Sequence, residues 1–228
     1  MLFRSPADAA LPNGTSCDVT MCLTGETCTA GTCGGGSPVV CAACESCDET
    51  AGCVAAPLES CRHTVLPGKS SLLIKDQSPD DSDKIIWKWA RGEETTVADF
   101  GTPGVDDGYA VCLYDETTLT PALVTRMTAP AAGTCGGNAC WRSVSSGFKY
   151  VDVEVTPDGV RKLLLKSGAS GSSAVTLKAK GANTPMPALP LGSVLRLQLH
   201  GNGECWEATF SPGGISQNDV LGFQAHSD

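Results

Sequence analysis

The sequence lacks long apolar runs, and with them any helix that could span a membrane. No stretch of the 228 residues approaches the ~20 consecutive apolar residues that such a helix needs. Amphipathic patterns with a helical period are also missing, so no α-helical core is expected. Positive charge is scarce as well. The net charge of −9 argues against nucleic acid or an anionic membrane as the main partner.

Catalytic motifs are equally scarce. The chain has three histidines, His63, His200 and His226, and none of them stands in the sequence context of an activated nucleophile. The Gly-x-Ser-x-Gly motif of serine hydrolases is absent. The Gly/Ser-rich stretch 168–173 lacks the lysine and the following helix of a phosphate-binding loop. We therefore expect no enzymatic activity.

Cysteine is what the sequence has in excess. Nine of the thirteen cysteines fall between residues 17 and 61, separated mostly by small and polar residues. This stretch contains no aromatic residue and few large aliphatic ones, so burial cannot offset its chain entropy and covalent bonds must hold it. The cysteines of the whole chain are Cys17, Cys22, Cys28, Cys33, Cys41, Cys44, Cys47, Cys53, Cys61, Cys112, Cys135, Cys140 and Cys205.

A metal cluster is the alternative to disulfides, because Cys41, Cys44 and Cys47 have the spacing that begins an iron–sulfur motif. The next cysteine, Cys53, comes too late for that motif and is followed by Val54 instead of proline. A zinc site would need two separated Cys/His pairs, which this stretch does not offer. We interpret the cysteines as structural disulfides. Disulfides indicate an oxidising compartment, which means the extracellular space or the outer cell surface.

The first sixteen residues contain no apolar segment of the kind that a secretory signal peptide requires. Because the cysteines indicate export, we expect that the signal peptide is missing from this sequence. We interpret residues 1–16 as a disordered leader or as the remnant of an upstream segment.

Composition divides the rest of the chain into three parts. Residues 17–62 form a cysteine-rich disulfide module, residues 63–70 a linker, and residues 71–228, which hold all four tryptophans, a β-domain. The β-domain consists of short β-rich runs bounded by Gly, Pro, Asp and Asn, which is typical of an antiparallel β-sandwich or jelly roll. The predicted fold class is all-β, with a small loop-dominated module before the sandwich. The predicted strands cover residues 71–75, 84–90, 109–114, 122–128, 140–144, 148–153, 160–166, 174–180, 194–200, 204–210 and 220–225.

The four cysteines of the β-domain allow three pairings. We favour Cys135–Cys140, which closes a small loop, together with Cys112–Cys205, which joins two predicted strands. The nine cysteines before them leave one without a partner, and we place that partner in a lost upstream repeat.

Four carboxylates between two predicted strands, those of Asp76, Asp80, Asp81 and Asp83, could hold calcium. The ligand order of an EF-hand is absent, so a solvated acidic turn is the favoured interpretation. No other cofactor is indicated.

Residues 159–196 contain basic residues and no acidic ones. Such a patch could bind an anionic polysaccharide or the acidic part of a neighbouring protein. The interpretation that we favour is that outward-facing strand lysines protect sheet edges against aggregation. The tryptophans could line a sugar platform, but Trp87 and Trp89 share a strand face with Ile85 and are expected in the core. The basic residues are Arg161, Lys162, Lys166, Lys178, Lys180 and Arg196.

The cysteine pattern resembles the cysteine-rich repeats of large secreted proteins from myxobacteria and related bacteria. The resemblance is carried by Gly14-Thr-Ser-Cys17, by Cys22-Leu-Thr-Gly-Glu-Thr-Cys28-Thr-Ala-Gly-Thr-Cys33 and by the glycine run before Cys41. The pattern Cys41-x-x-Cys44-x-x-Cys47-x5-Cys53 is similar to the terminal variant of these repeats, placed before a β-rich domain.

The β-domain also resembles an uncharacterised C-terminal domain of such proteins. The matching stretches are Ser71-Leu-Leu-Ile-Lys-Asp, Cys140-Trp141, Gly147-Phe-Lys-Tyr, Thr156-Pro-Asp-Gly, Lys180-Gly-Ala-Asn and Glu204-Cys-Trp-Glu-Ala. The resemblance implies an extracellular location and a modular architecture. It implies no established activity and no site residues.

We therefore expect an extracellular structural, adhesion or surface-binding module without catalytic activity. The alternative is a carbohydrate-binding module, calcium-assisted in one version. The expected partners are extracellular glycans or other surface proteins, and nucleic acid is not expected.

Overall fold

A computed structural model describes residues 11–228. The chain forms two compact units, which divide between Val54 and Ala55. We call residues 11–54 the ribbon unit and Ala55–Asp228 the sandwich unit. Each unit is described by itself.

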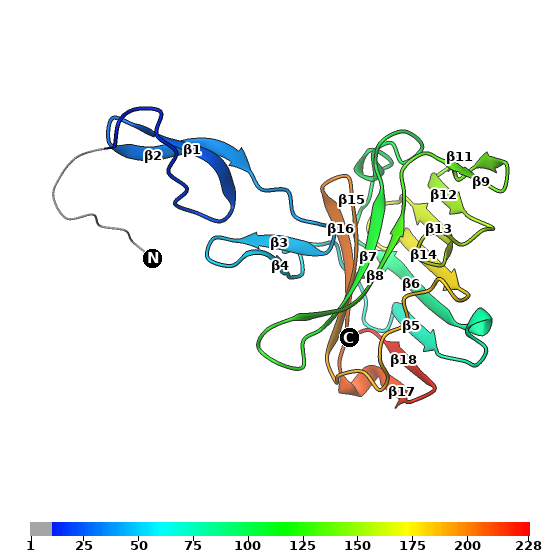
Figure 1. Ribbon diagram of the computed structural model, residues 1–228. Helices are drawn as coiled ribbons and strands as arrows, with labels where there is room; N and C mark the ends of the chain where they lie inside the picture. The colour runs from blue at the N-terminus through cyan, green and yellow to red at the C-terminus, as the bar shows by residue number, and fades with distance from the viewer. Residues whose placement is uncertain (1–10) are drawn as a thin grey trace. The chain divides into compact units, whose positions relative to one another are not determined.

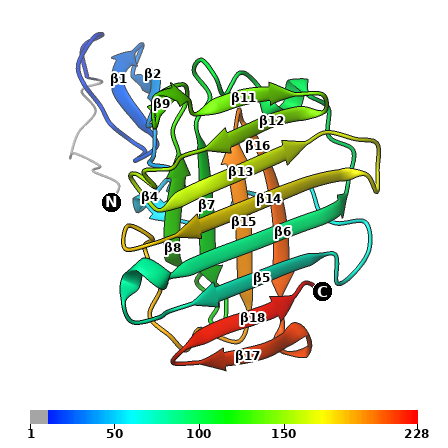
Figure 2. The same cartoon turned by 90° about the vertical axis from the view of Figure 1, so that its right-hand side faces the viewer.

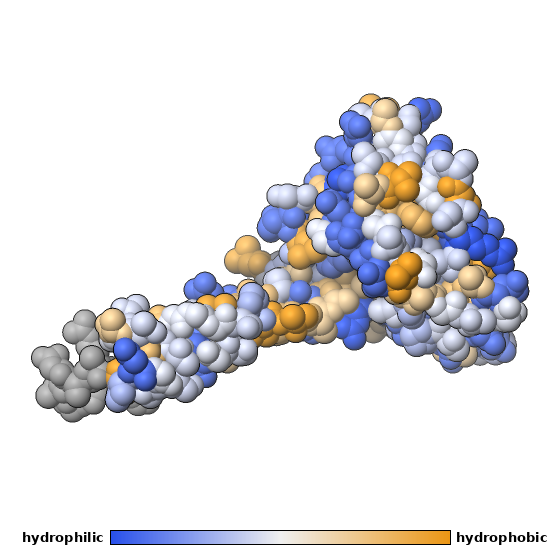
Figure 3. All heavy atoms as spheres, turned by 90° about the horizontal axis from the view of Figure 1, so that it is seen from above, coloured by the Kyte–Doolittle hydropathy of each residue, from blue (hydrophilic) through white to orange (hydrophobic). Residues whose placement is uncertain are grey.

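The ribbon unit consists of two small antiparallel hairpins, drawn in blue and light blue in Figure 1. Three disulfides bond segments within it, Cys17–Cys33, Cys22–Cys47 and Cys41–Cys53. Its surface is mostly pale in the hydropathy colours of Figure 3, because Gly, Ser and Thr predominate and little apolar surface is present to bury. The strands are β1 (Leu23–Thr29), β2 (Thr32–Pro38), β3 (Glu45–Asp48) and β4 (Gly52–Ala55).

The predicted leader, residues 1–16, lies partly outside the described residues. Its described end runs beside β1, where Ser16 forms a β-bridge to Thr27 and the Gly14 amide donates a hydrogen bond to the Cys28 carbonyl. These last residues therefore belong to the ribbon unit.

An eight-stranded antiparallel sheet forms one layer of the sandwich unit. Figure 2 looks onto this sheet, with β11 at the top and β17 at the bottom. The strands are, in sheet order, β11 (Trp141–Val144), β12 (Gly147–Val151), β13 (Val160–Lys166), β14 (Ser173–Lys180), β6 (Lys84–Gly92), β5 (Ser70–Lys75), β18 (Gly222–His226) and β17 (Ile215–Asp219).

A four-stranded antiparallel sheet forms the second layer. Figure 2 shows its strands behind the first sheet and running across it, an arrangement known from orthogonally packed sandwiches. Its strands are, in sheet order, β16 (Glu204–Phe210), β15 (Leu195–Gly201), β7 (Tyr109–Asp115) and β8 (Ala122–Ala129). A two-residue hairpin, β9 (Thr134–Cys135) with β10 (Asn138–Ala139), and three 3-10 turns, Asp80–Ser82, Ala98–Phe100 and Pro212–Gly214, complete the elements. No α-helix occurs in residues 11–228, and no described helix is long and apolar enough to cross a membrane.

The core lies between the two sheets and follows from strand alternation. On β6, Ile85, Trp87 and Trp89 point inward and are buried, while the residues between them point outward. The indole N–H of Trp87 donates to the Ser70 hydroxyl at 2.8 Å, and that of Trp89 to the Glu207 carbonyl at 2.9 Å, so the buried indoles keep hydrogen-bond partners. All four tryptophans are buried, as expected for Trp87 and Trp89, and none forms an exposed sugar platform.

The predicted all-β antiparallel class is confirmed, and each of the eleven predicted strands corresponds to an observed one within two residues at either end. The edge strand β17 was missed, because Ile-Ser-Gln-Asn-Asp has little apolar alternation to reveal it. The ribbon strands have equally little apolar alternation, and no bounds were predicted for them.

The boundary between the units lies earlier than the predicted one. Residues 55–62, predicted as part of the cysteine-rich module, belong to the sandwich unit. The predicted linker 63–70 is also bound there: Thr64 forms a β-bridge to Gly92, and the Val65 amide donates to the Arg91 carbonyl. Composition could not show this, because the segment pairs with strands distant in the sequence.

The disulfides of the sandwich unit correct one prediction. Cys135–Cys140 is confirmed, but Cys205 bonds to Cys61 and not to Cys112. The error arose because Cys61 was counted with the cysteine-rich module. Cys44 and Cys112 are each disulfide-bonded as well, which leaves Cys28, buried beside β2, as the free cysteine.

Candidate functional site

The outer face of the eight-stranded sheet carries a dense array of positive charge. Strand alternation turns nine Lys and Arg side chains of six strands away from the core. This is the face that Figure 2 presents to the viewer, and hydrophilic residues line the corresponding right-hand side of Figure 3. We call it the basic face, and its residues are Lys75, Lys84, Lys88, Arg142, Lys149, Lys162, Lys166, Lys178 and Lys180.

The strand register places several of these cations directly opposite one another. Lys84 of β6 stands between Lys180 of β14 and Lys75 of β5, so three lysines form a row across three strands. Lys162 and Lys178 form a second opposed pair. Neighbouring strands lie about 4.8 Å apart, and like charges placed directly opposite destabilise a sheet by up to about 1 kcal/mol per pair.

Few carboxylates lie within the strands that carry these charges. The eight strands contain one acidic residue, Asp219, at the end of the edge strand β17. Among the described residues, none of the nine side chains forms an ion pair. A chain with a net charge of −9 has thus collected more than half of its sixteen Lys and Arg residues on one sheet face.

Protection of sheet edges does not account for this arrangement. Lysines that prevent aggregation belong on edge strands, where backbone groups lack partners. Here the edge strands are β11 and β17, whereas eight of the nine residues lie on β12, β13, β14, β6 and β5, each of which is paired on both sides. A face that served only solubility would mix charges of both signs. Edge protection therefore does not explain the eight residues on interior strands.

The structure brings together four of the six residues predicted as an anionic-ligand patch: Lys162, Lys166, Lys178 and Lys180. Arg196 lies in the other sheet and forms ion pairs there, and Arg161 stands at a β-bulge, where its guanidinium donates to the Val153 carbonyl at 3.4 Å. Sequence proximity had grouped residues that the fold separates.

Five members of the basic face were missed by sequence reasoning. The alternation within β6 places two of them, Lys84 and Lys88, on the face away from the core. Their grouping with β14 depends on strand pairing, which one sequence does not reveal. The missed residues are Lys75, Lys84, Lys88, Arg142 and Lys149.

The predicted calcium ligands lie in the loop between β5 and β6. The carboxylate of Asp83 is buried and accepts a hydrogen bond from the backbone amide of Gln77 at 2.7 Å, which stabilises the loop. Asp76, Asp80 and Asp81 are exposed. Among residues 11–228, no group of three or more His, Cys, Asp or Glu side chains is arranged to hold a metal ion.

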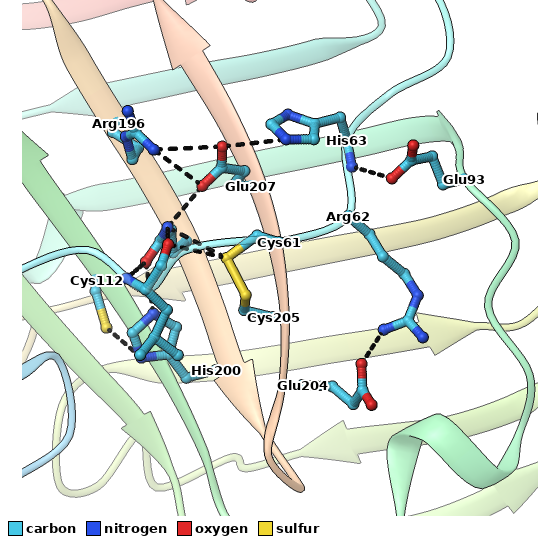
Figure 4. The surroundings of a disulfide bond; sticks show 12 residues. Cys61, Arg62, His63, Glu93, Cys112, Arg196, His200, Glu204, Cys205 and Glu207 are labelled. Atoms are coloured by element: carbon cyan, nitrogen blue, oxygen red, sulfur yellow. Dashed lines mark hydrogen bonds and ion pairs between the residues drawn. A yellow bond between two sulfur atoms is a disulfide. The ribbon is translucent and has the colours of Figure 1, made fainter. Parts of the chain in front are cut away.

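A second polar cluster lies on the outer face of the four-stranded sheet, around the Cys61–Cys205 disulfide (Figure 4). The buried carboxylate of Glu207 accepts hydrogen bonds from Gln198 at 2.6 Å and from Arg196 at 3.4 Å, and it lies 3.4 Å from the His63 ring. Arg196 also pairs with Glu116 at 2.9 Å. Burial alone would lower the pKa of Arg196, but the charges of Glu207 and Glu116 outweigh it and raise that pKa.

This cluster fastens the segment after Ala55 to the sheet. The Gln198 amide group bonds both the amide and the carbonyl of Leu58, at 2.9 and 2.8 Å, as a neighbouring strand would. The Tyr114 hydroxyl donates to the Ala56 carbonyl, and Arg62 forms ion pairs with Asp99 and Glu204. The charged and amide groups of this cluster thus form hydrogen bonds and ion pairs with one another, and they anchor the segment to the sheet.

The chain matches no protein-family model, no curated protein and no solved structure at a significant level. The resemblance to the cysteine-rich repeats and C-terminal domains of secreted myxobacterial proteins therefore stays a prediction.

Proposed function

We propose that this protein is an extracellular adhesion module without catalytic activity, and that its basic face binds an acidic polysaccharide. The observation that carries the proposal is the array of opposed, unpaired cations on interior strands. Their mutual repulsion lowers the stability of the sheet, and an anion that lies among them would relieve it.

The extracellular location is supported by the cysteines. Twelve of the thirteen are disulfide-bonded, and disulfides persist where the surroundings are oxidising. A ribbon unit with so little apolar surface depends on these bonds for its fold. An adhesion module outside the cell meets the polymers of matrices and cell surfaces, many of which are acidic.

A polysaccharide suits the face better than nucleic acid. Eight of the nine cations are lysines, which act as compact point charges and lack the planar fork with which arginine reads phosphates and bases. Single strands of nucleic acid bind through stacking on aromatic side chains. The tryptophans are buried, and no Trp, Tyr or Phe side chain of the described strands stands on the basic face. A neutral glycan has no anionic group that could compensate the positive charges of the face.

Binding to an immobilised acidic polysaccharide tests the proposal. The double variant Lys84→Gln/Lys178→Gln removes two charges from the centre of the face. A lysine near an anionic surface contributes about 1 kcal/mol, so we expect an affinity loss of about thirtyfold. The affinity of the unchanged protein should fall steeply with added salt, because exposed charges are screened.

The matched control is Arg126→Gln, which removes an exposed charge from β8 of the other sheet and should leave the affinity within about twofold. Equal losses in the control and the double variant would mean that only net charge matters. No binding of any acidic polysaccharide at low salt would overturn the proposed function.

A further inference from the structure

A depression of about 270 Å³ lies near the middle of the basic face. We propose that it is the subsite that recognises one uronic-acid ring of the bound polymer, a sugar ring that carries a carboxylate. This inference rests on the proposed function and names its substrate class. The depression lies across strands β14, β6, β5 and β18, all interior to the sheet.

The floor of the depression is apolar. Leu73 of β5 and Ile86 of β6 stand directly opposite each other, half-buried, among side chains that are otherwise charged or polar. A site for a bare anion, such as sulfate, gains nothing from aliphatic contacts. A pyranose ring, in contrast, has a face of C–H groups that such a floor can cover.

The walls of the depression differ in chemistry from one side to the other. Lys178 and Lys88 flank Ile86 on the side of β14 and β6. Ser71, Gln224 and His226 lie on the side of β5 and β18, where they offer a hydroxyl, an amide and an imidazole as hydrogen-bonding groups. This asymmetry fits a ring with a carboxylate at one end and hydroxyl groups at the other.

The size of the depression fits one ring better than a long segment. Sites that enclose drug-sized ligands measure roughly 300–1,000 Å³, and this depression lies just below that range. The remaining lysines of the face would then contact neighbouring acidic units of the polymer. Recognition would come from the depression, and much of the affinity from the charges around it.

An acidic polypeptide fits this position less well. Peptides that bind to sheets gain affinity by adding a strand at an edge with unpaired backbone groups. The strands that form the depression are each paired on both sides and offer side chains only. A peptide would have to bury its own backbone groups here without partners.

The test compares three polymers of similar length and charge density: a polyuronate, dextran sulfate and poly-glutamate. We expect the unchanged protein to bind the polyuronate about tenfold more tightly than either of the others. Leu73→Ser removes part of the floor, and Gln224→Ala removes the amide. Each should lower polyuronate affinity by about fivefold and leave dextran sulfate affinity within about twofold.

Leu164→Ser is the matched control, because Leu164 is a half-buried leucine on the same face but outside the depression. It should leave the preference unchanged. Equal binding of all three polymers, with Leu73→Ser and Gln224→Ala without effect, would overturn the subsite and leave the proposed function standing. A preference for dextran sulfate or poly-glutamate would overturn it as well. Failure of every polymer to bind would overturn the proposed function itself.

Discussion

At the scale of single residues, alternation decides which side chain enters the core and which meets solvent. On β6, Trp87 is fully buried and Lys88, the next residue, is exposed. The sequence predicted this correctly, because the period of a strand is two. The roles of Gln198 and Glu207 were not predicted. A buried polar side chain on a strand gives no sign in the sequence of the segment that it will bind.

The burial of His200 leads to a prediction about how the stability of the protein depends on pH. Burial lowers its pKa to about 4, whereas the ordinary value is about 6.5. Between these values the unfolded chain binds a proton that the folded protein excludes. Stability should therefore be lost as the pH falls from about 6.5 to about 4, by on the order of 2–3 kcal/mol.

Denaturant unfolding of the protein and of His200→Gln across this range is the measurement. Carboxylates also titrate here, so the difference between the two curves isolates the histidine. The difference should change steadily between pH 6.5 and pH 4. A constant difference would show that His200 does not titrate as described.

At the scale of elements, pairing turns separate strands into a surface. The predicted patch grouped basic residues by their proximity in sequence, and it included Arg196, which the fold assigns to the other sheet and pairs with Glu116. Strand existence could be predicted from local alternation. Strand order could not, because neighbours such as β14 and β6 are about ninety residues apart and loop entropy leaves many pairings open.

Removing one opposed cation should stabilise the sheet. Lys84 faces both Lys75 and Lys180, so Lys84→Gln relieves two repulsive pairs and should raise the free energy of unfolding by about 0.5–1 kcal/mol. Lys166→Gln is the control, because Lys166 faces Ala174 and Gly147. Denaturant titration measures both. If both variants have the same stability as the unchanged protein, the opposed lysines do not repel one another measurably.

The Cys61–Cys205 disulfide should stabilise the sandwich unit substantially. It joins residues 144 apart in the sequence, and closing so long a loop restricts the unfolded chain. The double variant Cys61→Ser/Cys205→Ser should lower the free energy of unfolding by about 2–5 kcal/mol. Thermal and denaturant unfolding measure the loss. Cys135–Cys140 closes a loop of only five residues, so the equivalent double variant should lose less. Equal losses would contradict the loop-length argument.

At the scale of the whole molecule, the two units achieve order by different means. The sandwich unit buries a continuous core between two sheets, whereas the ribbon unit has few buried residues and depends on covalent bonds. The sequence predicted this contrast, because cysteine density and aromatic content divide the chain. The predicted boundary lies too late in the chain. Residues 55–70 have the composition of a linker, but their backbone forms hydrogen bonds with strands of the sandwich unit.

The inventory of thiols tests the disulfide framework as a whole. Protein from an oxidising host should have a mass twelve hydrogen atoms below that of the reduced chain, since twelve cysteines are bonded. One thiol should react with an alkylating reagent, after denaturation only, and peptide mapping should place it at Cys28, which is buried. Several reactive thiols in the native protein, or extra mass from bound metal, would contradict the framework and the extracellular assignment together.

The central claim is that the outer face of the eight-stranded sheet binds an acidic polysaccharide. Backbone amide chemical shifts of the isotope-labelled protein, followed during titration with a short oligouronate at low salt, test it most directly. The account predicts saturable shifts concentrated on β13, β14, β6 and β5, largest around Leu73 and Ile86, and reversed by added salt. Shifts concentrated on β7, β8, β15 and β16, or no shifts at all, would contradict it.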